Sequence, residues 1–189
     1  MSSRLHWPRA VFRAKTRGQA LIIAAIMLPF IIAFVLLVIE VSERWLEVAL
    51  MEDALQQASR SAVQVMDYAA MARNQEWLRG VPATGCAHVT QAEPGACRAV
   101  VEVATTFLTT NLSSARGLAE GESVAAIARR VRWTILPNGG RCRYSNGAER
   151  TLVGQPLICA EVRPALRGIV GWGDYTPFIS ASDTLDAAR

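Results

Sequence analysis

A run of twenty residues near the N-terminus, which begins at Ala20 and ends at Ile39, contains no charged and no strongly polar side chain. A helix of this length spans about 30 Å, which is the thickness of the hydrocarbon core of a bilayer. An uncharged run this long is rarely the core helix of a soluble protein, so we expect a transmembrane helix over residues 18–40. Pro29, near its centre, removes one backbone hydrogen bond and is expected to kink or loosen the helix.

The basic residues of the chain are concentrated before this run. Residues 1–17 carry five basic side chains and no acid, a charge of +5 against +4 for the whole chain, so the rest is close to neutral. A basic segment beside an apolar span stays in the cytoplasm and attracts anionic lipid headgroups. We therefore expect a cytoplasmic tail over residues 1–17, with the remainder of the chain across the membrane. No basic patch with interleaved aromatic residues follows, so no nucleic-acid partner is expected.

A cleaved secretory signal is the alternative to a retained anchor. Both begin with basic residues, but the apolar core of a signal is only about 7–15 residues long. Residues 39–43, which follow the apolar core, also lack the small-x-small pattern of a cleavage site. The sequence therefore favours a retained anchor.

A helical pattern continues beyond the span, because residues 41–79 contain neither Gly nor Pro. Apolar or small side chains recur there at alternating spacings of three and four, which indicates one continuous helical face. The residues of this face are Val48, Met51, Leu55, Ala58, Ala62, Val65, Ala69 and Ala72. We expect a stalk helix over residues 41–79. Packing of its Ala-rich face against the chain's own globular part is favoured over a coiled coil with a partner, because alanine drives dimerisation weakly.

Residues 80–189 are expected to form a small extracytoplasmic α+β domain with an antiparallel sheet. Gly80 and Pro82 end the stalk helix and begin a loop. Alternating patterns and turn residues then predict the remaining elements. These are helices over 98–115 and 124–128, strands over 131–136, 141–145 and 157–162, turns at 137–140 and 146–147, and a further strand over 178–182.

The chain has four cysteines, Cys86, Cys97, Cys142 and Cys159, and all of them follow the span. The predicted topology places them in an oxidising compartment, where an even number indicates disulfides. Four cysteines allow three pairings, and we prefer the local one, Cys86 with Cys97 and Cys142 with Cys159, which closes two short loops. A metal site of Cys86, His88 and Cys97 is the alternative, but its spacing matches no trusted zinc pattern.

The sequence gives little support for an enzyme. Beyond the span there is one histidine, and no nucleophile-elbow, zinc-protease or phosphate-loop motif is present. Trp133 and Trp172 are interpreted as core or interfacial residues rather than as a platform for a ligand. We expect no catalytic residues, no cofactor and no metal.

Four short segments occur in a fixed order near the N-terminus. They are Arg17-Gly18-Gln19-Ala20-Leu21 at the membrane entry, Leu28-Pro29 in mid-span, Ile39-Glu40-Val41 at the exit, and LQQASRSA over residues 55–62. In this order and at these spacings they resemble the TadE/TadG-like family of Flp (Tad) pilus-assembly proteins. The resemblance covers about a third of the chain.

This resemblance implies a pseudopilin or minor pilin of the bacterial inner membrane that takes part in assembling a type IV pilus used for adherence. It implies partners among the assembly-platform proteins and pilin subunits, contacted through the span and the stalk helix. Members processed as prepilins are cut after a Gly and keep a Glu five residues on. Here the bond between Gly18 and Gln19 is the possible cleavage site, but the fifth residue is Ile23. We therefore expect most molecules to keep the tail.

Two other classes of function compete with this one. The stronger alternative is a membrane-tethered binding or adhesin module unrelated to pili. A membrane-bound hydrolase is the weaker alternative, because the sequence lacks a recognisable catalytic constellation.

Overall fold

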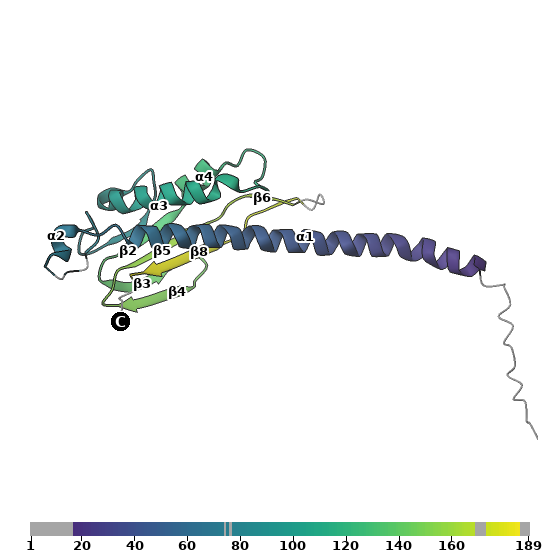
Figure 1. Ribbon diagram of the computed structural model, residues 1–189, viewed down its shortest axis with the longest axis horizontal. Coiled ribbons are helices and arrows are strands. Elements are labelled where there is room, and N and C mark those ends of the chain that lie inside the picture. The colour runs from purple at the N-terminus through teal and green to yellow at the C-terminus, as the bar shows by residue number, and fades with distance from the viewer. Residues whose placement is uncertain (1–16, 74, 76, 169–172, 186–189) are drawn as a thin grey trace, which may run out of the picture. The chain divides into compact units, whose positions relative to one another are not determined.

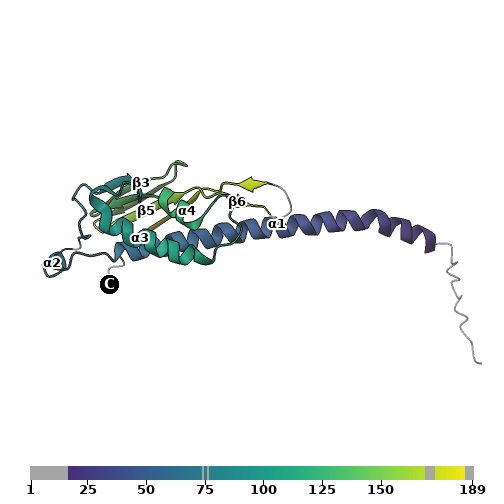
Figure 2. The ribbon, with the colours of Figure 1, turned by 90° about the horizontal axis from the view of Figure 1, so that it is seen from above.

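The computed structural model describes residues 17–73, 75, 77–168 and 173–185, with the side chains of residues 17–20 left out (Figures 1 and 2). The chain forms two compact units, residues 1–41 and 42–189. Most of the predicted basic tail and Trp172 lie outside the described residues. The fold is α+β, with one long apolar helix at the N-terminus and a small antiparallel-sheet domain, as the sequence predicts at this level.

The long helix, α1 (Arg17–Val63), has 47 residues and continues through Pro29. Its first part is apolar enough to cross a membrane, with a mean hydropathy of 3.2 over 18 residues, none of which is buried. Large apolar side chains there are exposed, from Leu21 at 73% to Ile39 at 43%. Such a surface is costly in water and favourable in lipid, which suggests that α1 anchors the chain in a membrane.

The helix ends at Val63, so the prediction of a stalk helix as far as residue 79 is wrong in its second half. Asp67 begins a new short helix, α2 (Tyr68–Met71), by accepting hydrogen bonds from the backbone N–H groups of Ala69 and Ala70. Aspartate is a favoured N-cap residue, so it favours the start of a new helix at this point over the continuation of α1. Met66 pairs instead with Leu78 in a β-bridge that buries both side chains. Val65 therefore leaves the helical face, although it still packs against the core.

The central sheet of the second unit has four antiparallel strands in the order β1-β2-β5-β8. They are β1 (Cys86–Val89), β2 (Arg132–Leu136), β5 (Leu157–Val162) and β8 (Ile179–Thr184). The last three correspond to predicted strands. We expected a loop where β1 forms, because its four residues carry little β pattern and β1 is irregular, with a register shift between Cys86 and Val89.

One face of this sheet forms the main core. Alternate residues along the strands, such as Trp133, Ile135, Ile158 and Ile179, are fully buried in one cluster. The cluster also takes in α1 and the helices α3 (Arg98–Asn111) and α4 (Val124–Arg130). From α1 it includes Leu55, Ala58 and Ala62, at most 1% exposed. The Ala-rich face of α1 thus packs within its own domain.

The other face of the sheet is covered by a hairpin of β3 (Gly139–Arg143) and β4 (Glu149–Val153). A second, smaller cluster lies beneath it, built on Cys142, Leu157 and Cys159. Tyr144 donates a hydrogen bond from its hydroxyl to the carbonyl oxygen of Ala181 at 3.1 Å. A short two-stranded ribbon, β6 (Leu166–Arg167) with β7 (Asp174–Tyr175), completes the fold. The strand predicted over residues 141–145 overlaps β3, which begins two residues earlier inside the predicted turn, and β4 and the ribbon were not predicted.

Candidate functional site

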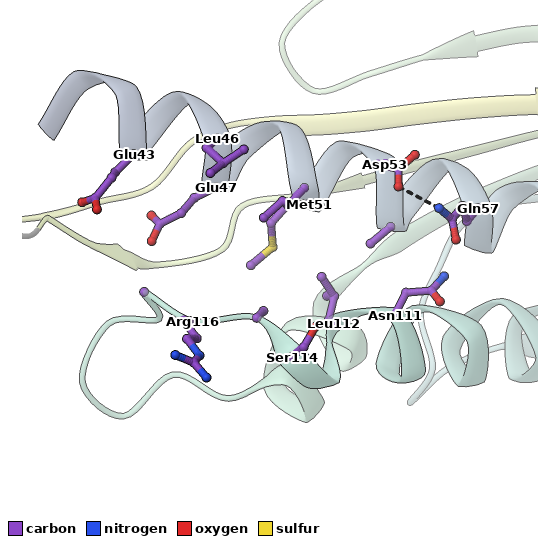
Figure 3. A pocket seen from close by; sticks show the side chains of 14 residues that line it. Glu43, Leu46, Glu47, Met51, Asp53, Gln57, Asn111, Leu112, Ser114 and Arg116 are labelled. Carbon is purple, nitrogen blue, oxygen red and sulfur yellow. Dashed lines mark hydrogen bonds between the residues drawn. The ribbon is translucent and has the colours of Figure 1, made fainter. Parts of the chain in front are cut away.

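A groove of about 650 Å³ lies between α1 and the segment that follows α3 in the second unit (Figure 3). We call it the α1 groove. On α1 it is lined by residues at helical spacings of three and four, so that one stripe of the helix forms a wall. The lining residues are Glu43, Leu46, Glu47, Leu50, Met51, Asp53, Ala54 and Gln57 from α1, and residues 111, 112 and 114–117 from the facing segment.

The α1 wall combines apolar and acidic side chains. Leu46 and Leu50 are 54% and 59% exposed, although they belong to the unit with the packed core. Asp53 accepts a hydrogen bond from Gln57 at 2.7 Å. Glu47 accepts one from the hydroxyl of Tyr175 at 2.8 Å. The wall therefore offers apolar contact area and fixed carboxylates together, which suits a partner with apolar and basic groups.

The facing wall depends on a glycine at one point. Gly117 has a φ of +79°, and a Cβ built there would overlap Oε1 of Glu47. Glycine satisfies both the left-handed backbone and the close approach. Arg116, beside it, is the one basic residue among the described residues that line the groove. The segment thus comes close to α1 at Glu47 and leaves the groove open around Leu46 and Leu50.

Two disulfides brace the second unit. Cys86 is bonded to Cys97 and Cys142 to Cys159, with S–S distances of 1.99 and 2.04 Å, which is the pairing we preferred. The first ties β1 to the start of α3, and the second ties the hairpin to β5. Cys86 and Cys97 thus have no thiolate left for the alternative metal site with His88. Among the residues that the structure describes, no three metal-ligating side chains of the usual types cluster.

A second hollow, of about 210 Å³, lies on the hairpin side of the sheet. We call it the arginine hollow. It is lined by Arg130, Arg132, Ser145, Glu161, Val162, Arg163 and Phe178. Glu161 is only 5% exposed, and it accepts a hydrogen bond from the backbone N–H of Ser145 at 2.7 Å. The guanidinium of Arg132 forms an ion pair with the same carboxylate, with 2.8 Å between the nitrogen and the oxygen. This opposite charge offsets part of the cost of burying the Glu161 carboxylate.

Arg130, at the edge of the arginine hollow, is paired with Glu122. Burial by itself raises the pKa of the Glu122 carboxyl. The hydrogen bond and charge of Arg130, with hydrogen bonds from the backbone N–H groups of Ala165 and Ser123, together outweigh this effect and bring the pKa below its ordinary value. The carboxylate is therefore charged at neutral pH and holds the Arg130 guanidinium in place.

The residues predicted to matter fall into separate parts of the chain. Gly18 and Gln19 lie in the first turn of α1, where only the backbone is described, and the side chain of Ala20 is likewise not described. Of the predicted stalk face, Leu55, Ala58 and Ala62 lie in the core and Val65 packs against it, whereas Met51 also lines the α1 groove. Ala69 and Ala72, beyond the end of α1, are exposed. The sequence pattern alone predicts neither of these two hollows. Their signals were an acidic and apolar stripe on α1, which includes Glu43 and Glu47, and eight arginines between residues 129 and 167.

Comparison of the chain with protein-family models, with curated proteins and with solved structures finds no match in any of the three.

Proposed function

We propose that this protein is a membrane-anchored, pseudopilin-like component that takes part in the assembly of a Tad/Flp type IV pilus. The observation that carries the proposal is the division of α1. Its apolar part is exposed along its whole length, whereas its second part contributes Leu55, Ala58 and Ala62 to the core of the α+β domain. One helix thus serves as anchor and as spine of the domain. The motif resemblance at the N-terminus supplies the connection to pilus assembly.

The proposal includes an orientation. By the positive-inside rule the basic tail favours a cytoplasmic N-terminus, and in this proposal the α+β domain lies in the periplasm of a bacterium with an inner membrane. Two disulfides among the four cysteines support this side of the membrane, because disulfides form and persist in oxidising compartments. In this arrangement the exposed apolar helix is available to lipid and to the spans of pilin and platform subunits.

A membrane-tethered binding or adhesin module is the second candidate. The α1 groove favours it, because a partly apolar hollow with exposed Leu46 and Leu50 suits a binding partner from outside the assembly machinery. This function would use the span only as a tether.

Deletion of the gene separates the two candidates. In the assembly role, the deletion strain loses surface pili and adherence together, and the full chain restores both. In the adhesin role, pili remain normal in number while adherence falls. Pili counted by electron microscopy, beside an adherence assay on the same cultures, give both readouts. Normal piliation, with no second copy of the gene in the genome, would contradict the assembly role.

A further inference from the structure

We propose that copies of this chain associate side by side, with the arginine hollow of one copy against the acidic wall of the α1 groove of the next. The proposal goes beyond the role in pilus assembly and does not depend on it. It requires only that the copies are anchored by the same helix and therefore point the same way.

The arginine hollow presents positive charge outward although its arginines are paired. In the Arg132–Glu161 pair the guanidinium side chain is 47% exposed and the carboxylate side chain 6%. In the Arg130–Glu122 pair the values are 53% and 5%. The carboxylates lie behind and fix the guanidinium groups, whose remaining N–H donors face solvent. Fixed arginines lose less conformational freedom when they bind a second carboxylate.

Arg163 adds a third cation to this surface. Its guanidinium lies 5.5 Å from the ring centroid of Phe178, a distance at which the aromatic face attracts it. Arg163 is exposed, so its charge can reach a partner, and Phe178 and Val162 add apolar groups to the lining of the hollow.

The α1 groove complements this surface in charge and in polarity. Glu43, Glu47 and Asp53 lie along one wall, and Arg116 is the only basic residue among the described lining residues. The exposed side chains of Leu46 and Leu50 lie between the acids. An arginine-rich surface with an apolar edge fits such a wall, since opposite charges pair across it and apolar groups are removed from water.

The two surfaces also lie at the same level along α1. Tyr175 contacts Glu47, and Asp183 pairs with Arg60 at 3.1 Å, so β8 and its approach run beside this part of α1. Ser180 lies between these two anchor points. In the sheet register Ser180 of β8 lies opposite Glu161 of β5, and Glu161 lies opposite Arg132 of β2. The arginine hollow is therefore level with the stretch between Glu47 and Arg60, where Asp53 lies. Parallel neighbours can meet there without an axial shift.

The two surfaces are built from different elements. The α1 groove is lined by α1 and residues 111, 112 and 114–117, whereas the arginine hollow is lined by residues of α4, β2, β5 and the segments beside them. Each contact joins the arginine hollow of one copy to the α1 groove of another, so it is heterologous. Each copy keeps its other surface free for a further neighbour, and the contact repeats from copy to copy. It generates a row or a ring of copies.

Photo-crosslinking of the full chain in its native membrane tests this contact. A photoreactive phenylalanine analogue replaces Leu50 in the groove or, as a matched control, Glu52. Glu52 is exposed, but it lies about two and a half turns from Glu43 and so on the other side of the helix. We expect a product of twice the monomer mass from position 50 and little from position 52. Equal dimer from both positions, or products with other proteins only, would overturn the proposal.

Charge exchange identifies the partner surface. Arg163→Glu should reduce the dimer from position 50 by about tenfold, the effect of losing one close charge pair. Asp53→Arg in the same chain should restore it, whereas Glu52→Arg should not. Both disulfides, checked by mobility without reductant, show that each variant has folded. Unchanged dimer with Arg163→Glu, or no rescue by Asp53→Arg, would assign the contact elsewhere. Pilus counts are scored separately, so failure of this contact leaves the assembly role standing.

Discussion

The hydroxyl of Tyr175 lies 2.8 Å from Oε2 of Glu47, across 128 residues of sequence, and ties the C-terminal ribbon to the long helix. Arg44, one turn before Glu47, lies over the same ring with its guanidinium carbon 4.6 Å from the centroid. A charged acceptor and a cation on one aromatic ring hold the ribbon against α1.

Tyr175→Phe should therefore loosen this attachment. The ring and its contact with Arg44 remain, but the hydrogen bond to Glu47 is lost, which costs about 0.5–1.5 kcal/mol. Thermal unfolding of the full chain in detergent measures the cost, and hydrogen exchange should rise in residues 174 and 175. Tyr68→Phe is the control, because Tyr68 is 80% exposed. An equal shift from both substitutions would contradict the assigned hydrogen bond.

Removal of the Cys142–Cys159 disulfide should release the hairpin from the sheet. The bond joins residues 17 apart, and in the chain-entropy treatment a loop of about this size gives about 3 kcal/mol. We expect the double substitution Cys142→Ser and Cys159→Ser to lower the free energy of unfolding by about this amount. Peptide mapping of the wild-type chain without reductant should show Cys86–Cys97 and Cys142–Cys159. Crossed pairs or free thiols would contradict the structure.

The ionisation of Tyr144 reports the position of the hairpin. Burial raises the pKa of the Tyr144 hydroxyl, which is hydrogen-bonded to Ala181 beneath the hairpin. In the double serine variant this pKa should return toward its ordinary value, and ultraviolet titration follows the change. A Tyr144 pKa that stays raised would mean that the hairpin remains docked without the disulfide.

Acid should weaken the region around Glu122. Because the pKa of Glu122 is lower in the folded chain than its ordinary value of 4.5, the charged form stabilises the fold. That stability is complete at neutral pH and is lost as the pH falls through 4.5 toward the folded pKa. Glu122→Gln should lower stability at pH 7 and flatten its decline in acid. Glu120→Gln, at a side chain 92% exposed, is the control and should leave both unchanged.

The N-terminal tail should remain on most molecules. Cleavage between Gly18 and Gln19 would place a positive α-amino group at the end of an apolar helix, which is costly inside a fibre without a carboxylate nearby. Ile23 cannot supply one, and Glu40 lies about 26 Å further along the helix. Intact mass of protein from its native membrane measures the outcome. A mature chain that begins at Gln19 would contradict this prediction and would indicate a processed minor pilin.

The parts of the fold that follow from local pattern could be predicted from the sequence. The apolar run, the α+β class and the strands around Trp133 and Ile158 each have a period or a length that few other structures share. The end of α1 could not be predicted from the sequence, because no Gly or Pro lies near Val63. It ends where Asp67 caps a new helix and Met66 finds a partner in Leu78, which is a tertiary contact.

The two hollows could not be predicted for the same reason. The acids of α1 were visible as a cluster, but the wall that faces them comes from residues more than fifty positions away. The arginines of the second hollow belong to α4, β2 and the segment after β5. Only the sheet register, which pairs Arg132 with Glu161, brings their charges together.

We propose that one helix anchors the chain in the membrane and that the disulfide-bonded unit lies outside the cytoplasm. Fusion of two reporters after Arg189, one active only in the periplasm and one only in the cytoplasm, tests it most directly. We expect activity from the periplasmic reporter alone, and we expect the fusion protein to remain with the membrane after washing at high salt. Activity from the cytoplasmic reporter alone would contradict the claim.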